Sequence, residues 1–246
     1  MKILVCISKV PDTTAKIAFK DNNTAYDTDG VQFIINPYDE WYALVRALEI
    51  KESQGGSVTV LNVGGPENDP TIRKALAIGA DGAVRVNINS TDAMNTAQNI
   101  AGFAKEEGFD IVFCGKETID YNGSQVGGMI AALLDMPYIS YASKLDLDGS
   151  KATIERDIQG GKEILEVEVP FVLSAAKGMA EARIPNMRGI MAARTKPLNV
   201  IEPSSSDNMT EIVSYELPPA KGECKFVDAE NPEELIELLR NEAKII

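Results

Sequence analysis

The chain of 246 residues carries 24 Lys and Arg against 37 Asp and Glu, which gives a net charge of −13, and it contains no histidine. Without an imidazole, neither a Ser-His-Asp or Cys-His catalytic relay nor a histidine-bearing zinc site is possible. The acidic balance argues against a protein that coats nucleic acid or an anionic membrane surface. No apolar stretch approaches the ~20 residues of a membrane span, so we expect no membrane insertion.

The first part of the chain alternates strand and helix signals. Short β-branched runs are typical of strands buried on both faces of a parallel sheet, and caps, prolines and glycines mark the helices between them. This rhythm predicts a doubly wound parallel sheet with right-handed crossovers. The expected strands are 3–7, 57–63, 83–86 and 110–114; the expected helices open at Asn36-Pro37, Asp69-Pro70, Asp92 and Val126.

After Pro137 the pattern changes to short strands over 141–147, 151–158, 163–169 and 171–175, with hairpin-turn residues between them. We expect an antiparallel meander that extends the parallel sheet, followed by a short helix over 188–193. The predicted organisation is an α/β nucleotide-binding domain over 1–200 and an extended arm over 201–246, which ends in a helix capped by Asn231-Pro232. The arm clasps a partner subunit or packs on its own domain.

In an open α/β sheet, ligands bind beyond the carboxyl ends of the strands. The segments 6–12, 36–39, 63–66 and 115–128 follow expected strands, and the last is rich in glycine and leads into a helix. Its backbone N–H groups are suited to hold a phosphate, although the segment is neither a Walker A loop nor a GxGxxG fingerprint. The alternative is that these glycines only form turns.

Cysteine and carboxylate side chains suggest weaker possibilities. The three cysteines are far apart and form no CxxC pair, which favours a reduced, cytoplasmic compartment. Cys6 and Cys114 each end an apolar run and are interpreted as small core residues. Asp12, Asp39 and Asp120 are a possible carboxylate cluster, but helix caps and turns explain them better. We therefore predict no metal site.

Residues 183–191 combine two Met, two Ile and two Arg in a segment without a strong core period. Flexible, polarizable methionines recur on surfaces that grip several partners. The segment is therefore a candidate docking surface, and a buried short helix is the alternative.

The same segments, in the same order, resemble the β subunit of electron transfer flavoprotein over nearly the whole chain. Each motif alone is weak, but their order and spacing together are specific. The matching pieces are Ser8-Lys9-Val10-Pro11-Asp12, Asn36-Pro37-Tyr38-Asp39-Glu40, 71–81, the loop 115–129, the meander 154–161 with 170–173, and the region 183–194.

This resemblance implies an adenine-nucleotide α-hydrolase-like fold and the small subunit of a heterodimer, located in the cytoplasm of a bacterium. A larger α subunit would hold most of the FAD site. The pair would accept electrons from flavin dehydrogenases such as acyl-CoA dehydrogenase and pass them toward a membrane quinone oxidoreductase. The small subunit would be an electron-carrier component and no enzyme by itself. It would bind AMP, or a second FAD in the bifurcating branch of the family.

The resemblance also assigns roles to particular residues. Thr13 and Tyr38 would approach the flavin. Met187 takes the place of a leucine that family members insert into a dehydrogenase, with Arg183, Arg188, Ile190 and Met191 beside it. The adenine-nucleotide pocket would be lined by Cys6, Asn36, Tyr38, Asp39, Gly64, Gly115, Lys116, Glu117, Thr118, Ile119, Asp120, Tyr121, Asn122, Gly123, Ser124, Gln125 and Val126.

Some positions depart from the family pattern. Thr13 stands where some relatives have tyrosine, and Gln159 replaces an acidic residue of the meander signature. The nucleotide loop lacks the Asp-Gly-Asp-Thr run of the bifurcating branch, which favours AMP, although its Gln125-Val126-Gly127 portion is shared with that branch. A flavin-free nucleotide-binding module of the same superfamily is the alternative. An ATP-pyrophosphatase would need a Ser-Gly-Gly-x-Asp-Ser loop, which residues 8–12 do not supply.

Overall fold

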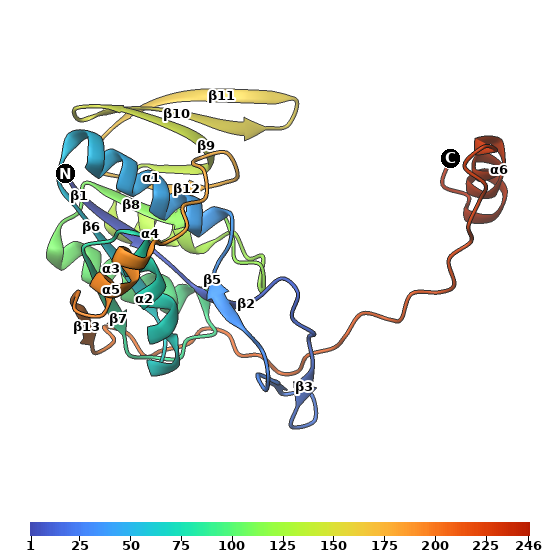
Figure 1. Cartoon of the computed structure of the whole chain (residues 1–246), viewed down its shortest axis with the longest axis horizontal. Coiled ribbons are helices and arrows are strands. Elements are labelled where there is room, and N and C mark those ends of the chain that lie inside the picture. The colour runs from blue at the N-terminus through green and yellow to red at the C-terminus, as the bar shows by residue number, and fades with distance from the viewer.

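One mixed sheet organises the body of the protein. The computed structural model describes residues 1–246, and its nine-stranded sheet has the order β11-β10-β9-β12-β8-β1-β6-β7-β13 (Figure 1). The strands are β1 (Lys2–Cys6), β6 (Ser57–Val63), β7 (Gly82–Val86), β8 (Ile111–Gly115), β9 (Tyr138–Asp148), β10 (Lys151–Ile158), β11 (Gly161–Glu168), β12 (Phe171–Ala175) and β13 (Leu198–Ile201).

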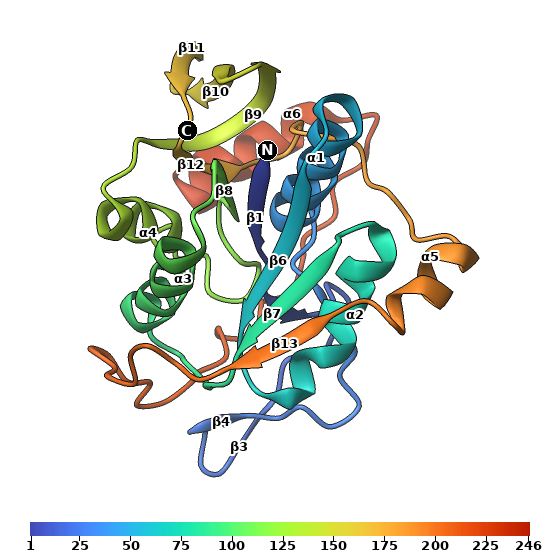
Figure 2. The ribbon, with the colours of Figure 1, turned by 90° about the vertical axis from the view of Figure 1, so that its left-hand side faces the viewer.

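Helices cover both faces of this sheet (Figure 2). One face packs against α1 and α2, and the other packs against α3 and α4. This is the doubly wound α/β arrangement that the sequence predicts. The helices are α1 (Asp39–Gln54), α2 (Asp69–Ile78), α3 (Ala93–Glu107), α4 (Val126–Leu134), α5 (Met187–Ala193) and α6 (Pro232–Leu238), with short turns η1 (Pro66–Asn68) and η2 (Leu239–Ala243). None of the helices is both long and apolar enough to cross a membrane.

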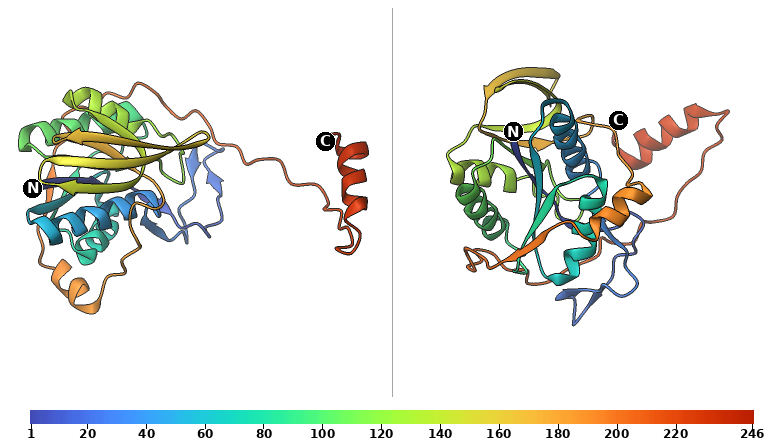
Figure 3. Two further views of the ribbon diagram at one scale, coloured as in Figure 1. Left: turned by 90° about the horizontal axis from the view of Figure 1, so that it is seen from above. Right: turned by 60° about the vertical axis from the view of Figure 1, so that its left-hand side comes forward.

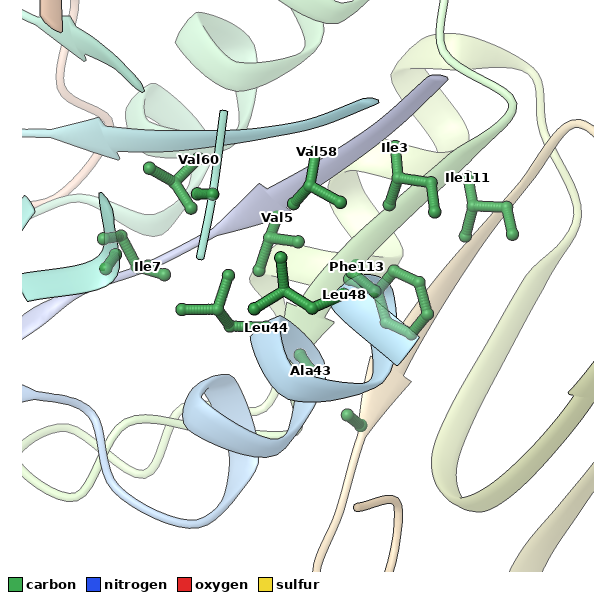
Figure 4. Close-up of a cluster of buried hydrophobic side chains, with 14 of the residues drawn as sticks. Ile3, Val5, Ile7, Ala43, Leu44, Leu48, Val58, Val60, Ile111 and Phe113 are labelled. Carbon is green, nitrogen blue, oxygen red and sulfur yellow. The ribbon is translucent and has the colours of Figure 1, made fainter. Parts of the chain in front are cut away.

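Alternation along β1 divides its side chains between two cores. Ile3, Val5 and Ile7 belong to the cluster with α1 and α2, whereas Leu4 and Cys6 belong to the cluster with α3 and α4. Figure 4 shows the first cluster, in which Leu44 and Leu48 of α1 lie close to the side chains of three parallel strands. Because a central strand is buried on both faces, its carboxyl end is fixed in position.

Strands β9 to β12 do not form the simple antiparallel meander that the sequence predicts. Only β10 and β11 are antiparallel additions; β9 pairs in parallel with β12, and β12 inserts between β9 and β8. The sequence predicts these four short strands, but it does not predict that the last one, β12, pairs with the parallel strand β8. Small pairs β2 (Lys9–Pro11) with β5 (Phe33–Ile35), and β3 (Phe19–Lys20) with β4 (Ala25–Tyr26), were also not predicted.

The starts of α1 and α2 also differ from the prediction. Asn36 is buried and does not cap α1; the residue before the helix is Tyr38, with φ of 65°. Asp69 is the first residue of α2, and its carboxylate accepts a hydrogen bond from Arg85 at 2.8 Å. The sequence predicts that Asn36 and Asp69 each cap a helix, but each side chain instead forms a hydrogen bond to a residue distant in the sequence.

The chain leaves the body after β13. Residues 202–215 run back along α3 toward the β3–β4 hairpin, and the rest extends to α6, which lies apart from the body (Figures 1 and 3). No residue of α6 is buried. The final helix is therefore present close to where the sequence predicts it, and its apolar side chains do not pack on the body of the protein.

Candidate functional site

A cavity of about 630 Å³ opens at the carboxyl ends of the central strands. Its wall includes the ends of β1, β6 and β8, and the loops that follow them. The chain proceeds from β1 to β6 on one side and later places β8 on the other side of β1. The strand order therefore reverses between β1 and β8, which is the position where open α/β sheets bind ligands.

The loop between β8 and α4 is held in place by hydrogen bonds to Asn36, which precedes α1, and to Asp39, the first residue of α1. The Asn36 amide donates to the Glu117 carbonyl at 2.8 Å and accepts from the Ile119 N–H at 3.0 Å. Asp39 accepts from the Glu117 N–H at 3.3 Å. Asn36 therefore supports the cavity wall through the loop backbone, which explains why this buried amide is unavailable as a helix cap.

Two helix N-termini face the cavity, and they differ in how they are capped. Asp92 caps α3 by accepting from the Asn95 N–H at 2.7 Å, so a carboxylate already occupies that end. The start of α4 has no side-chain cap, and Gln125, Val126 and Gly127 line the cavity there. Uncapped N–H groups and the positive end of the helix dipole favour an anion. The α4 terminus is thus the end of the cavity that is best suited to an anion.

Glu40 is buried and forms part of the cavity wall. Its carboxyl accepts from the Ser8 N–H at 2.5 Å and from the Ser8 hydroxyl at 2.8 Å. Burial raises the pKa of Glu40 from 4.5 to about 8, against the opposing effect of the Ser8 hydrogen bonds. Near neutral pH the carboxyl is therefore largely uncharged and does not repel an anionic ligand.

This raised pKa makes stability depend on pH. Folding takes up a proton at Glu40, so its contribution to stability is present below about pH 4.5 and is lost as the pH rises through about 8. We expect the free energy of unfolding of the native chain to fall with pH in this window, relative to Glu40→Gln, by up to about 1.4 kcal/mol per pH unit. Thermal unfolding from acidic to alkaline pH measures it. Glu223→Gln, which removes an exposed carboxylate of the arm, is the control. Parallel pH profiles for the native chain and Glu40→Gln would contradict the expectation.

The cavity has one wall that no motif indicated. Met209 and Thr210 line it, although they belong to the arm. The Thr210 hydroxyl donates to Asp92 at 2.6 Å, and the Asn95 amide donates to the carbonyls of Ser205 and Asp207 at 3.1 and 3.2 Å. We call residues 204–215 the strap. Its serine-rich composition is typical of a linker, so only these tertiary contacts reveal its role.

The far end of the strap is fixed on the β3–β4 hairpin. The Tyr215 N–H donates to the Asn23 carbonyl at 2.8 Å, and the Tyr215 ring stacks on Phe19 with a centroid distance of 4.8 Å. The strap therefore joins the N-terminus of α3 to the hairpin and closes one side of the cavity.

The structure brings most of the predicted pocket residues together. Those that line the cavity are Cys6, Gly64, Gly115, Lys116, Glu117, Thr118, Asp120, Tyr121, Gly123, Ser124, Gln125 and Val126. Asn36, Tyr38, Asp39, Ile119 and Asn122 lie outside its wall. Thr13 and Tyr38 are exposed, Tyr38 by 54%.

The candidate docking segment continues into α5, which begins at Met187, and it is largely exposed. Met187, Met191 and Ile190 are 74%, 56% and 41% exposed, so the alternative of a buried helix is wrong. Arg188 is exposed as well, whereas Arg183 is bound to Glu52 of α1 through two hydrogen bonds of 2.6 and 3.0 Å.

The back of α5 is anchored on α2. Gly189 lies so close to the Ala77 carbonyl that an added Cβ would stand 2.3 Å from the oxygen. Arg73 donates to the carbonyls of Ala193 and Lys196 at 2.8 and 2.6 Å. The exposed methionines therefore project from a fixed helix.

The three aspartates considered for a metal site do not form one. Asp12 accepts hydrogen bonds from the backbone and hydroxyl of Thr14 at 2.9 and 2.7 Å, as a turn residue does. No group of three or more His, Cys, Asp or Glu side chains is placed to hold a metal ion.

Together, the doubly wound sheet and the cavity at its switch point define an α/β protein whose cavity lies where sheets of this kind bind ligands. The family model described as "Electron transfer flavoprotein domain" matches residues 23–206. The chain is 36% identical to electron transfer flavoprotein subunit beta of Bacillus subtilis, with both chains covered in full. It is 32% identical to the human subunit beta, with 100% of this chain and 99% of the human protein covered. The chain belongs to the family of electron transfer flavoprotein β subunits.

Proposed function

We propose that the chain is the small subunit of a heterodimeric electron transfer flavoprotein. With a larger α subunit that holds most of an FAD site, it accepts electrons from flavin dehydrogenases such as acyl-CoA dehydrogenase and passes them toward a quinone oxidoreductase. The observation that supports this proposal is the cavity at the β1–β8 switch point, in a chain of this family. The redox chemistry belongs to the flavin, and this subunit supplies position and electrostatics.

The cavity of this subunit fits an adenine nucleotide. Cys6, Leu61, Ile100 and Cys114 provide an apolar part of the wall, which suits a base, and the uncapped start of α4 suits a phosphate. The uncharged form of Glu40 removes a repulsive charge from the cavity wall.

We favour AMP as this nucleotide. The strap bounds the cavity beside α3, and the loop 115–126 lacks the acidic run associated with the bifurcating branch. Both features favour a mononucleotide over a second FAD.

Two exposed regions are assigned to the α subunit. Thr13 and Tyr38 are available at the surface, which suits an approach to a flavin held by another chain. The arm beyond the strap carries exposed apolar side chains, including Phe226 at 95%, and a helix without buried residues. Such an arm suits a clasp around the partner.

Co-purification with an α subunit tests the main proposal. We expect the complex to show the visible absorption of bound flavin. The same chain without residues 216–246 should lose the α subunit, because the proposed clasp is removed and the strap is kept. A complex without flavin would contradict the proposal.

Extraction of bound nucleotides tests the cavity. Acid treatment of the complex followed by chromatography should give AMP and FAD in equal amounts. Thr91→Trp should abolish the AMP peak, because Thr91 lines the cavity and an indole there would fill it. Thr153→Trp, on an exposed position of β10, is the matched control and should retain AMP. Two FAD per heterodimer would refute the assignment of AMP.

Removal of one exposed methionine tests the docking helix. Met187→Ala should weaken electron uptake from a dehydrogenase by roughly tenfold, the effect of losing about 1.4 kcal/mol of contact in an interface, with unchanged flavin content. Leu133→Ala removes another exposed apolar side chain, 42% exposed against 74% for Met187, from α4 on the opposite face of the sheet and should have no such effect. Normal uptake by Met187→Ala would show that α5 is only structural.

A further inference from the structure

Cys6 and Cys114 occupy neighbouring positions at the β1–β8 switch point. The register pairs Val5 with Phe113, so the two cysteines follow one position further along the adjacent parallel strands. Both belong to the core cluster on the side of α3 and α4, which places both side chains on the same face of the sheet. Adjacent strands are about 4.8 Å apart. This separation falls within the Cα–Cα range of about 4.4–6.8 Å that a disulfide spans.

The two thiols are buried but not sealed. Their residues are only 7% and 4% exposed, yet both line the cavity of about 630 Å³. The neighbouring Cys114 thiol, together with burial, raises the pKa of Cys6. A small uncharged molecule in the cavity therefore meets two thiols side by side. The remaining cysteine, Cys224, is exposed on the arm.

We propose that Cys6 and Cys114 are a redox-active dithiol, which hydrogen peroxide entering the cavity converts to an intramolecular disulfide. One thiol, as its thiolate, attacks a peroxide oxygen; the O–O bond breaks, and a sulfenic acid and one water form. The second sulfur attacks the sulfenic sulfur, the S–S bond forms, and the hydroxyl leaves as a second water. Two thiols lose two electrons and two protons, and peroxide is reduced to two waters.

The environment determines the relative rates of the two steps. The raised pKa of Cys6 keeps its thiolate fraction small, so the first step is slower than at an exposed cysteine. The second step is intramolecular between adjacent positions and follows at once. We therefore expect the disulfide as the product, with little accumulation of sulfenic or sulfinic acid. The bond would join β1 to β8 across the cavity floor and thereby alter the surface that a bound base would contact.

The full chain carrying Cys224→Ser is the material for the test, since this variant removes the exposed thiol. It is treated with hydrogen peroxide, free thiols are blocked under denaturing conditions, and peptides are mapped without reduction. We expect both free thiols to be lost together and the peptides of Cys6 and Cys114 to be linked. Dithiothreitol should restore both thiols. Oxidised methionines do not affect this readout, because it detects only thiols and their cross-link.

Single substitutions test whether the cross-link requires both Cys6 and Cys114. Cys6→Ser and Cys114→Ser should yield no cross-link and should leave the other cysteine as a free thiol or in an oxygenated form. Circular dichroism confirms that each variant is folded before it is compared. The proposal is wrong if the folded Cys224→Ser chain keeps both thiols after peroxide treatment. It is also wrong if one cysteine becomes a sulfinic acid and no link to the other forms.

Peroxide treatment with and without AMP tests the dithiol separately from the proposed nucleotide binding. The disulfide is judged in the absence of nucleotide, so its formation there supports the dithiol whatever the cavity binds. Saturating AMP should slow the reaction at least severalfold, because a base against the cavity floor would cover both sulfurs. Disulfide formation that is unchanged by AMP would count against the nucleotide assignment and would leave the dithiol supported.

Discussion

The reversal of strand order between β1 and β8 is the constraint on which the rest of the structure depends. β1 is buried on both faces and paired on both edges, so its carboxyl end cannot move without disturbing both cores. The loops from its two neighbours must diverge there, because the chain continues to opposite faces of the sheet. The cavity follows from this topology, and the side chains around it decide only what it accepts.

An acidic chain can bind an anion only where the repulsion from its negative charges is reduced locally. With a net charge of −13, the average surface repels phosphate. The cavity offsets this locally: burial keeps Glu40 largely protonated, Lys116 pairs with Glu117 at 2.8 Å, and the start of α4 is left uncapped. The absence of histidine is consistent with such a site, since it positions a ligand and needs no proton relay near neutral pH.

Sequence reasoning succeeded where local pattern and tertiary structure agree. β6 has the predicted bounds and α4 begins at the predicted residue, because a buried apolar strand and a glycine-led helix require no distant partner to be recognised. It failed where a distant contact overrides the pattern. Asn36 has the composition of a cap but holds a loop 81 residues away, and Met209 and Thr210 reach the cavity from a segment that looks like a linker. The insertion of β12 is equally non-local.

The two surfaces assigned to partners are built on opposite physical principles. The exposed methionines of α5 stand on a helix that is fixed from behind by Arg73 and by the close approach of Gly189, so little order has to be gained on docking. The arm has no such support. A helix as short as α6 gains most of its stability from packing, and α6 packs on the adjoining turn η2 but not on the body of the protein. Ordering the arm on binding therefore reduces its net binding energy, so a stable contact needs a large buried interface. That difference supports the proposal that the arm contacts the α subunit and that α5 contacts exchangeable donors.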